Sequence, residues 1–218
     1  MSDVVTIDVY SDVICPWCYV GKRRLERALA RLDDVQTRVT WRPFQLNPTM
    51  PKEGMDRTTY LEAKFGSLVA FRRLEEHILA AGSSEAIPFA FERIVRTPNT
   101  FTAHRLIWYA GQHGCQDTMV DSLFRGYFEE GVDIASSEAL TRLAASAGLD
   151  AEDFLRSDEG VAEVKAEEAA GHRLGIRGVP YFVFNNRSAI SGAQPAEEFV
   201  AAIQKVRAQP VEGLMSNR

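Results

Sequence analysis

Apolar and polar positions alternate along residues 5–10 and again around Val39 and Trp41, where Pro43 ends the pattern. A period of two is typical of a β-strand with one buried face. Between these runs, apolar residues recur at helical spacing after Pro16, whose fixed φ and missing N–H suit the first position of a helix. The first part of the chain therefore predicts a strand, a helix and a second strand.

The middle of the chain has helical periodicity instead. Prolines and a glycine indicate a connecting loop over 45–56, and the pattern after it predicts one long helix from about Thr58 to Gly82. Further helices are expected at about 100–113, 117–129, 136–147, 151–156 and 159–174. Short strands at 181–184 and 189–190 and a helix over 194–207 follow. The predicted order is β-α-β, a helical block, and then β-β-α.

The composition is that of an ordinary globular protein. The chain has 218 residues, of which 45% are hydrophobic and 25% charged, enough to bury a core without disulfide bonds. Its net charge of -5 argues against nucleic acid as a partner, because phosphate-binding proteins usually carry an excess of Lys and Arg. No secretory signal and no run of roughly 18 apolar residues is visible, so we expect a cytoplasmic protein without membrane contact.

Three cysteines carry the candidate chemistry. Cys15 and Cys18 form a Cys-x-x-Cys pair and Cys115 stands alone, so a disulfide scaffold is not indicated. In a reducing compartment such a pair is catalytic or binds a metal. A zinc site would need further ligands from Cys115 or the four histidines, and neither a second Cys-x-x-Cys nor a His-x₃-His spacing occurs. We expect no metal, and we interpret Cys115 as a structural residue at a helix end.

The position of Cys15 predicts a reactive sulfur. A strand leads into the loop that carries Cys15, and a helix starts at Pro16, which places the sulfur beside unpaired N–H groups and the positive end of the helix dipole. A thiolate is stabilised there, which predicts a thiol pKa below the free value of roughly 8.5. Cys18 lies one turn into the helix and is expected to be the more buried, resolving thiol. Lys22 and Arg23 are candidates to add positive potential at Cys15, although salt would screen these charges if they are exposed.

A second element, Gly178-Val179-Pro180-Tyr181, precedes a predicted strand. Together with Cys15-Pro16-Trp17-Cys18, it resembles the DsbA family of the thioredoxin superfamily, in which a helical domain interrupts the thioredoxin fold. Within that family the sequence is most similar to the FrnE-like subgroup, which is related to the 2-hydroxychromene-2-carboxylate isomerases. The matching stretches are 11–23, 43–48, 99–100 with 103–105, 175–182 and 191–194.

This resemblance implies an α/β thioredoxin fold, β-α-β and β-β-α, interrupted by an all-helical insertion domain. The thioredoxin-like domain would comprise 1–48 and 175–210 and the insertion 49–174, with a flexible tail at 211–218. The resemblance makes Pro180 a catalytic candidate beside Cys15 and Cys18, because it implies a cis Val179–Pro180 bond that packs against the dithiol. Val179 backbone groups would then be free to pair with a substrate. Trp17 cannot carry a positive charge, so we expect this protein to be a milder oxidant than a relative that has His at the same position.

Six residues are candidate thiol-binding or substrate-binding positions, namely Pro16, Trp17, Val179, His104, Gln45 and Asn47. His104 is either a partly buried helix residue or a proton shuttle that faces the dithiol. Asp12 either caps the loop or accepts a proton from Cys18. Gln45 and Asn47 either satisfy loop backbone groups or contact a bound glutathione.

Three functions stay open at this point. The first, which we favour, is a thiol–disulfide oxidoreductase, as an oxidase, reductase or isomerase of protein or small-thiol disulfides. The second is a glutathione-dependent isomerase or transferase, although relatives with that activity place Ser where Cys15 stands. The third is a non-catalytic peptide-binding or chaperone module with an inert dithiol. No cofactor is expected except glutathione as an optional co-substrate, and the protein is expected to be a monomer or a homodimer.

The phenylalanines of the helical block bear on the third function. We interpret them as core of that block, with a hydrophobic groove for unfolded chains as the alternative. They are Phe65, Phe71, Phe89, Phe91 and Phe101.

Overall fold

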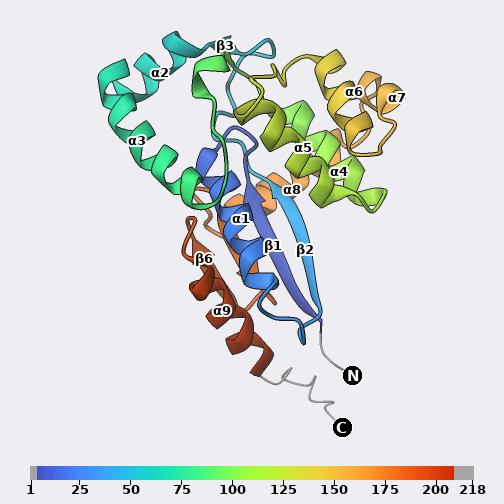
Figure 1. The fold of residues 1–218 in the computed structure, drawn as a ribbon. Helices are drawn as coiled ribbons and strands as arrows, with labels where there is room; N and C mark the ends of the chain where they lie inside the picture. The colour runs from blue at the N-terminus through green and yellow to red at the C-terminus, as the bar shows by residue number, and fades with distance from the viewer. Residues whose placement is uncertain (1–3, 209–218) are drawn as a thin grey trace.

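The computed structural model describes residues 4–208, and its centre is a four-stranded mixed sheet (Figure 1). The strands are β1 (Val5–Ser11), β2 (Thr37–Pro43), β5 (Tyr181–Phe184) and β6 (Ser188–Ser191), in the order β2-β1-β5-β6. β1 runs parallel to β2 and antiparallel to β5, and β5 is antiparallel to β6. The strands predicted near the two ends of the chain therefore form one sheet.

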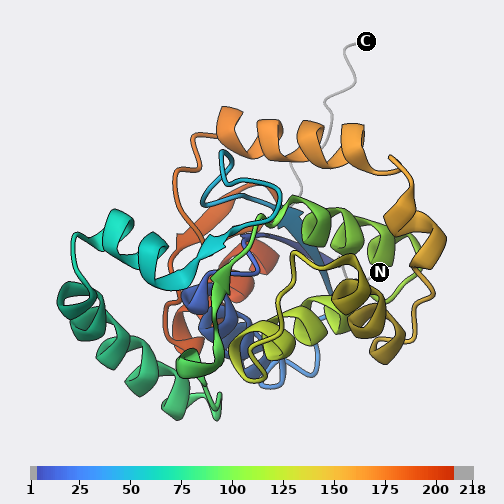
Figure 2. The same cartoon turned by 90° about the horizontal axis from the view of Figure 1, so that it is seen from above.

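Helices cover both faces of this sheet (Figures 1 and 2). On one face lie α1 (Pro16–Leu29) and α9 (Ala196–Ala208), and their apolar side chains form one buried cluster with Val5, Ile7 and Val9 of β1. On the other face lies α8 (Val161–Arg173), so close that a Cβ atom on Gly171 would come within 2.7 Å of the Tyr10 ring. The fold is an α/β thioredoxin-like fold, as predicted.

The segment between β2 and β5 forms the insertion. In Figure 2, α2 (Arg57–Phe65) and α3 (Leu68–Ser84) project to one side of the remaining helices. Its elements are β3 (Met55–Asp56), α2 (Arg57–Phe65), α3 (Leu68–Ser84), the 3₁₀ segment η1 (Phe91–Arg93), β4 (Arg96–Thr97), α4 (Phe101–Gln112), α5 (Gln116–Phe128), α6 (Ser137–Ser146), α7 (Glu152–Arg156) and α8.

The insertion differs from the sequence prediction in two places. The long helix expected over 58–82 is two helices, because Gly66 adopts a left-handed φ of 82° and the Ser67 hydroxyl accepts a hydrogen bond from the backbone N–H of Ala70. The strands β3 and β4 pair with each other and were not predicted, because two residues are too few to display a period of two. Within residues 4–208, the insertion is helical apart from this small sheet.

A buried lysine joins α1 to the insertion. Lys22 is 2% exposed, and its ammonium group lies 3.0 Å from Asp117 and 3.8 Å from Asp121 of α5. Arg23 pairs with Asp121 at 2.7 Å. These positive charges are compensated by carboxylates and therefore do not provide the free positive potential considered for Cys15.

Two further predictions concern the ends of the chain and membranes. The flexible tail predicted at 211–218 lies outside the described residues. Among residues 4–208, no helix combines the length and the apolar character needed to cross a membrane.

Candidate active site

The dithiol lies at the junction of β1 and α1. Cys15 is the N-cap of α1, with φ of -93° and ψ of 109°, and Pro16 is the first helical residue, as predicted. The backbone N–H of Cys15 donates to the carbonyl of Asp12 at 3.0 Å, and the Cys15 carbonyl accepts from the N–H of Cys18 at 3.0 Å. No acidic side chain stands in the first turn of α1, so nothing in that turn offsets the positive end of the helix dipole.

The two sulfurs have different surroundings. Cys15 is 5% exposed and Cys18 is 0% exposed, which confirms that Cys18 is the more buried thiol. Burial raises the pKa of the Cys18 thiol, and the hydrogen bond between Cys18 and Cys15 raises it further. Cys18 therefore keeps its proton while Cys15 is the sulfur nearer the surface.

The loop before β5 closes over the dithiol. The Val179–Pro180 peptide bond is cis, as predicted, and the thiol of Cys15 donates to the carbonyl of Val179 at 3.7 Å. Pro180 packs against α1, because a Cβ atom on Gly21 would lie 3.2 Å from the Pro180 ring. The backbone N–H of Val179 makes no hydrogen bond within residues 4–208, so this group is free to meet a substrate.

Asp12 and His104 meet beneath the dithiol loop. Both side chains are buried, and His104 comes from the second turn of α4. The Asp12 carboxylate accepts from the backbone N–H of Leu46 at 2.7 Å, and its second oxygen lies 3.4 Å from Nε2 of His104. The Asp12 side chain thus bonds to the loop after β2, while in the Cys15 loop it is the Asp12 backbone carbonyl that accepts a hydrogen bond. His104 reaches the loop that carries the dithiol, although whether it shuttles protons stays a prediction.

Gln45 and Asn47 tie the loop after β2 to the helices around it. The backbone N–H of Gln45 donates to Glu168 of α8 at 2.7 Å, and the Gln45 side chain is buried. The Asn47 side-chain amide bonds to the hydroxyl of Tyr60 at 3.0 Å and accepts from Lys64 at 3.2 Å. Their contact with glutathione stays a prediction. Trp17, in contrast, is 36% exposed beside the dithiol.

Comparison with known proteins decides the family. A family model described as a DSBA-like thioredoxin domain matches residues 6–204. The chain belongs to the DsbA-like thioredoxin domain family. Members of this family are thiol–disulfide oxidoreductases, and the Cys15–Cys18 pair stands near the N-terminus of α1 in this chain.

Individual relatives agree with this assignment. The crystal structure of a probable DsbA oxidoreductase from Streptomyces coelicolor is 33% identical, with a TM-score of 0.87, covering 97% of this chain and 94% of that one. The uncharacterized protein YwbO of Bacillus subtilis is 27% identical over 91% of this chain and 96% of its own length. A 2-hydroxychromene-2-carboxylate isomerase structure is 16% identical, with a TM-score of 0.70 over 92% of this chain and 95% of that one, and shares the fold.

One residue of this DsbA-like site was not predicted from the sequence. Ser11 and the backbone of Asp12 both lower the pKa of the Cys18 thiol against the effect of burial, so Ser11 belongs to the surroundings of this sulfur. Ser11 continues the alternation of Val5, Ile7 and Val9 and so points to the face that α1 covers. The sequence did offer one signal for Ser11, because it is a polar residue at the position where the buried apolar face of the strand would continue.

The third cysteine lies apart from this chemistry. Cys115 is the N-cap of α5, and its thiol donates to the carbonyl of Ala110 at 3.6 Å, which agrees with a structural residue at a helix end. Within the described part of the chain, no three His, Cys, Asp or Glu side chains are grouped so that they could hold a metal ion.

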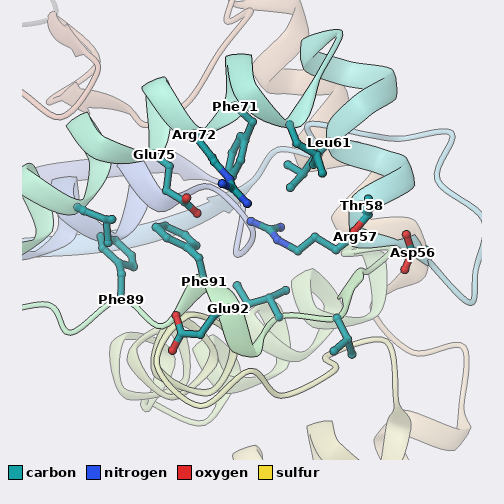
Figure 3. A pocket seen from close by; sticks show the side chains of 14 residues that line it. Asp56, Arg57, Thr58, Leu61, Phe71, Arg72, Glu75, Phe89, Phe91 and Glu92 are labelled. Atoms are coloured by element: carbon teal, nitrogen blue, oxygen red, sulfur yellow. The ribbon is translucent and has the colours of Figure 1, made fainter.

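A groove of about 510 Å³ lies between α2, α3 and η1 (Figure 3). The Arg57 guanidinium lies in it, 5.7 Å from the ring centre of Phe71 and 5.9 Å from that of Phe91. Phe89 also lines the groove, whereas Phe65 and Phe101 are not among its walls. Phe71 and Phe91 are buried, so these phenylalanines are packed side chains that also form the walls of a surface groove.

Proposed function

We propose that this DsbA-like protein exchanges disulfides with protein substrates through Cys15 and Cys18. The observation that carries this proposal is the pairing of a helix-capping Cys15 with a fully buried Cys18, beside the Val179 carbonyl at 3.7 Å. A thiolate at a helix N-terminus is the form that attacks a disulfide. The buried partner keeps its proton until the first exchange is complete.

The reaction has two exchange steps. The Cys15 thiolate attacks one sulfur of the substrate disulfide, a bond forms between them, and the other substrate sulfur leaves as a thiolate that takes a proton. Cys18 then loses its proton and attacks Cys15, which expels the second substrate thiolate. Two electrons pass from the dithiol to the substrate, and a small thiol such as glutathione restores the dithiol. The reverse sequence oxidises a substrate.

The free N–H of Val179 supports binding of an extended substrate chain beside the dithiol. Such a chain would pair with this backbone as an added strand. Pro16 and the exposed Trp17 would face it from the start of α1. We place the protein in the FrnE-like subgroup and in the cytoplasm as part of the same proposal, with Trp17 giving a milder oxidant than a relative with His at that position.

Reduction of insulin is the first test of this function. With a small thiol as reductant, the wild-type protein is expected to accelerate insulin reduction, and Cys15→Ser is expected to remove the acceleration. Loss of the attacking sulfur removes the whole covalent route, so the expected loss is at least about 100-fold, the size typical of removing a nucleophile. Cys115→Ser is the matched control and should retain full activity. Equal rates for wild type and Cys15→Ser would exclude the proposed function.

A further inference from the structure

The groove between α2, α3 and η1 is a surface site that neither cysteine of the dithiol lines. Its volume of about 510 Å³ falls within the range of about 300–1,000 Å³ that is usual for ligand-binding sites. Buried Leu61, Phe71 and Phe91 give it apolar walls. Leu79 and Val95 also line it, and they are 41% and 65% exposed. Large exposed apolar side chains gathered at a groove are typical of a surface that a partner covers.

Two guanidinium groups, those of Arg57 and Arg72, point toward one another in this groove (Figure 3). The Arg57 guanidinium is held against the rings of Phe71 and Phe91. Its Nη1 also donates to the hydroxyl of Tyr127 at 3.3 Å. Within residues 4–208, neither arginine forms an ion pair with a carboxylate. Like charges repel, so a carboxylate placed between the two groups would be attracted by both.

The carboxylates of the groove limit what it accepts. Glu75 and Glu92 are part of its lining. Burial raises the pKa of Glu75, against the opposing effect of Arg57 and Arg72. In Figure 3, Glu75 lies on the Phe89 side of the two guanidinium groups, where it would repel a second acidic group. The groove therefore fits one acidic side chain among apolar ones, and it does not fit a strongly acidic segment.

The groove shares an aromatic wall with the helix that carries the dithiol. Phe89 lines the groove and contacts Tyr19 of α1, with 6.0 Å between the ring centres. Tyr19 is fully buried and directly follows Cys18 in the sequence. A polypeptide bound in the groove would thus lie one aromatic side chain away from α1, so that a disulfide further along the same polypeptide can reach Cys15.

We propose that this groove binds a segment of the protein substrate in which apolar residues flank a single acidic side chain, which rests on the proposed function. The guanidinium groups of Arg57 and Arg72 hold the carboxylate, and the apolar neighbours cover Leu79 and Val95. A planar guanidinium that is already held in place loses little freedom when it binds a carboxylate. The groove keeps the polypeptide in place while its disulfide meets Cys15. It therefore lowers the KM for protein substrates and has no effect on small disulfides.

Fluorescence anisotropy tests this site with a labelled, cysteine-free peptide that carries one glutamate among leucines. A second peptide has glutamine in place of the glutamate. The wild-type protein should bind the glutamate peptide about tenfold more tightly, the effect of a hydrogen bond to a charged group. Arg57→Gln should remove this difference and leave binding of the glutamine peptide unchanged. Arg72→Gln, at an exposed position, should reduce the difference by about threefold.

The neighbouring residues of α3 offer matched controls. Arg73 is exposed next to Arg72 but does not line the groove, so Arg73→Gln should bind both peptides as the wild type does. Leu74, 47% exposed and also outside the groove, is the control for Leu79. Leu79→Ser should weaken both peptides by about threefold, since it removes apolar contact area, and Leu74→Ser should weaken neither.

Kinetics connect the groove to catalysis. A disulfide substrate built on the glutamate peptide should show a KM about tenfold higher with Arg57→Gln and an unchanged kcat, because the groove binds the polypeptide away from the reacting sulfurs. The rate with oxidised glutathione should stay the same. Cys15→Ser should bind the glutamate peptide as tightly as the wild type does.

The possible failures are distinguishable. Equal binding of the two peptides by the wild type, or equal weakening of both by Arg57→Gln, would overturn the proposal for the groove and leave the proposed function intact. A concentration-dependent dimer that is lost in Leu79→Ser would assign the groove to a second copy of this chain and would overturn it as well. Peptide binding without any disulfide exchange would overturn the proposed function itself, and with it the role of the groove in catalysis.

Discussion

Replacing Cys18 with serine is expected to trap the substrate on Cys15. A serine hydroxyl does not attack the mixed disulfide under conditions in which a thiol does, so the second exchange step stops while the first one proceeds. Turnover with insulin should fall by at least about 100-fold, as is usual when a nucleophile is removed. The covalent adduct should instead accumulate and be visible by intact-protein mass spectrometry.

The location of that adduct separates the roles of the cysteines. In Cys18→Ser, proteolytic mapping should find the substrate on Cys15. Cys115 stands apart from the dithiol at the start of α5, where its thiol donates to the carbonyl of Ala110. The double variant Cys18→Ser with Cys115→Ser is the control and should trap as much substrate. If the adduct disappears in the double variant, the substrate was bound to Cys115, and the assignment of Cys15 as the attacking sulfur would be contradicted.

Truncating Phe182 to alanine is expected to lower the free energy of unfolding by about 3–5 kcal/mol, the range measured for buried Phe. Phe182 is fully buried on β5, and its ring lies 4.7 Å from the ring of Phe199 on α9. It also contacts α1, because a Cβ atom on Gly21 would lie 3.1 Å from the ring. The side chain therefore joins the sheet to both helices of that face, beside the loop that carries Pro180.

Urea unfolding measures this loss. Val183→Ala is the matched control, because Val183 is the next residue on the strand, points to the opposite face and is only half-buried. Its truncation should cost about 1 kcal/mol, the value for one or two partly buried methyl groups. Equal losses for the two variants would contradict the assignment of Phe182 to the central core.

Much of the thioredoxin-like part could be predicted from local patterns. The alternation at Val5, Ile7 and Val9 gave β1, and Pro16 marked the first residue of α1. These signals are local, since they depend on one strand with a buried face and on the fixed φ of one proline. The strand order could not be derived from such signals, because pairing between β1 and β5 joins residues far apart in the sequence.

The insertion shows where the local patterns fail. Apolar residues keep their helical spacing on both sides of Gly66, so periodicity alone predicts one helix where the structure has α2 and α3. The break depends on a left-handed glycine followed by a capping serine, which is turn chemistry and not periodicity. The strands β3 and β4 pair two residues each, Met55 with Thr97 and Asp56 with Arg96, which is too short a stretch to leave a sequence signal.

The site divides in a similar way. Cys15 and Cys18 could be found from their spacing, and the cis bond at Pro180 from resemblance to a family. The effect of Ser11 on the Cys18 thiol and the approach of His104 to the buried Asp12 could not. Those placements depend on how β1, α1 and α4 pack around one another, which no short stretch of sequence encodes.

A redox titration of the protein in glutathione buffers tests the central claim most directly. Each sample is quenched with acid and alkylated, and the tryptic peptide that ends at Lys22 is weighed by mass spectrometry. The account predicts a single two-electron transition in which Cys15 and Cys18 lose their alkylation sites together. The oxidised peptide then carries no alkyl group and has the mass of the unalkylated dithiol peptide less two hydrogen atoms. If the two sulfurs are never joined to each other, even in fully oxidised glutathione, the account is contradicted.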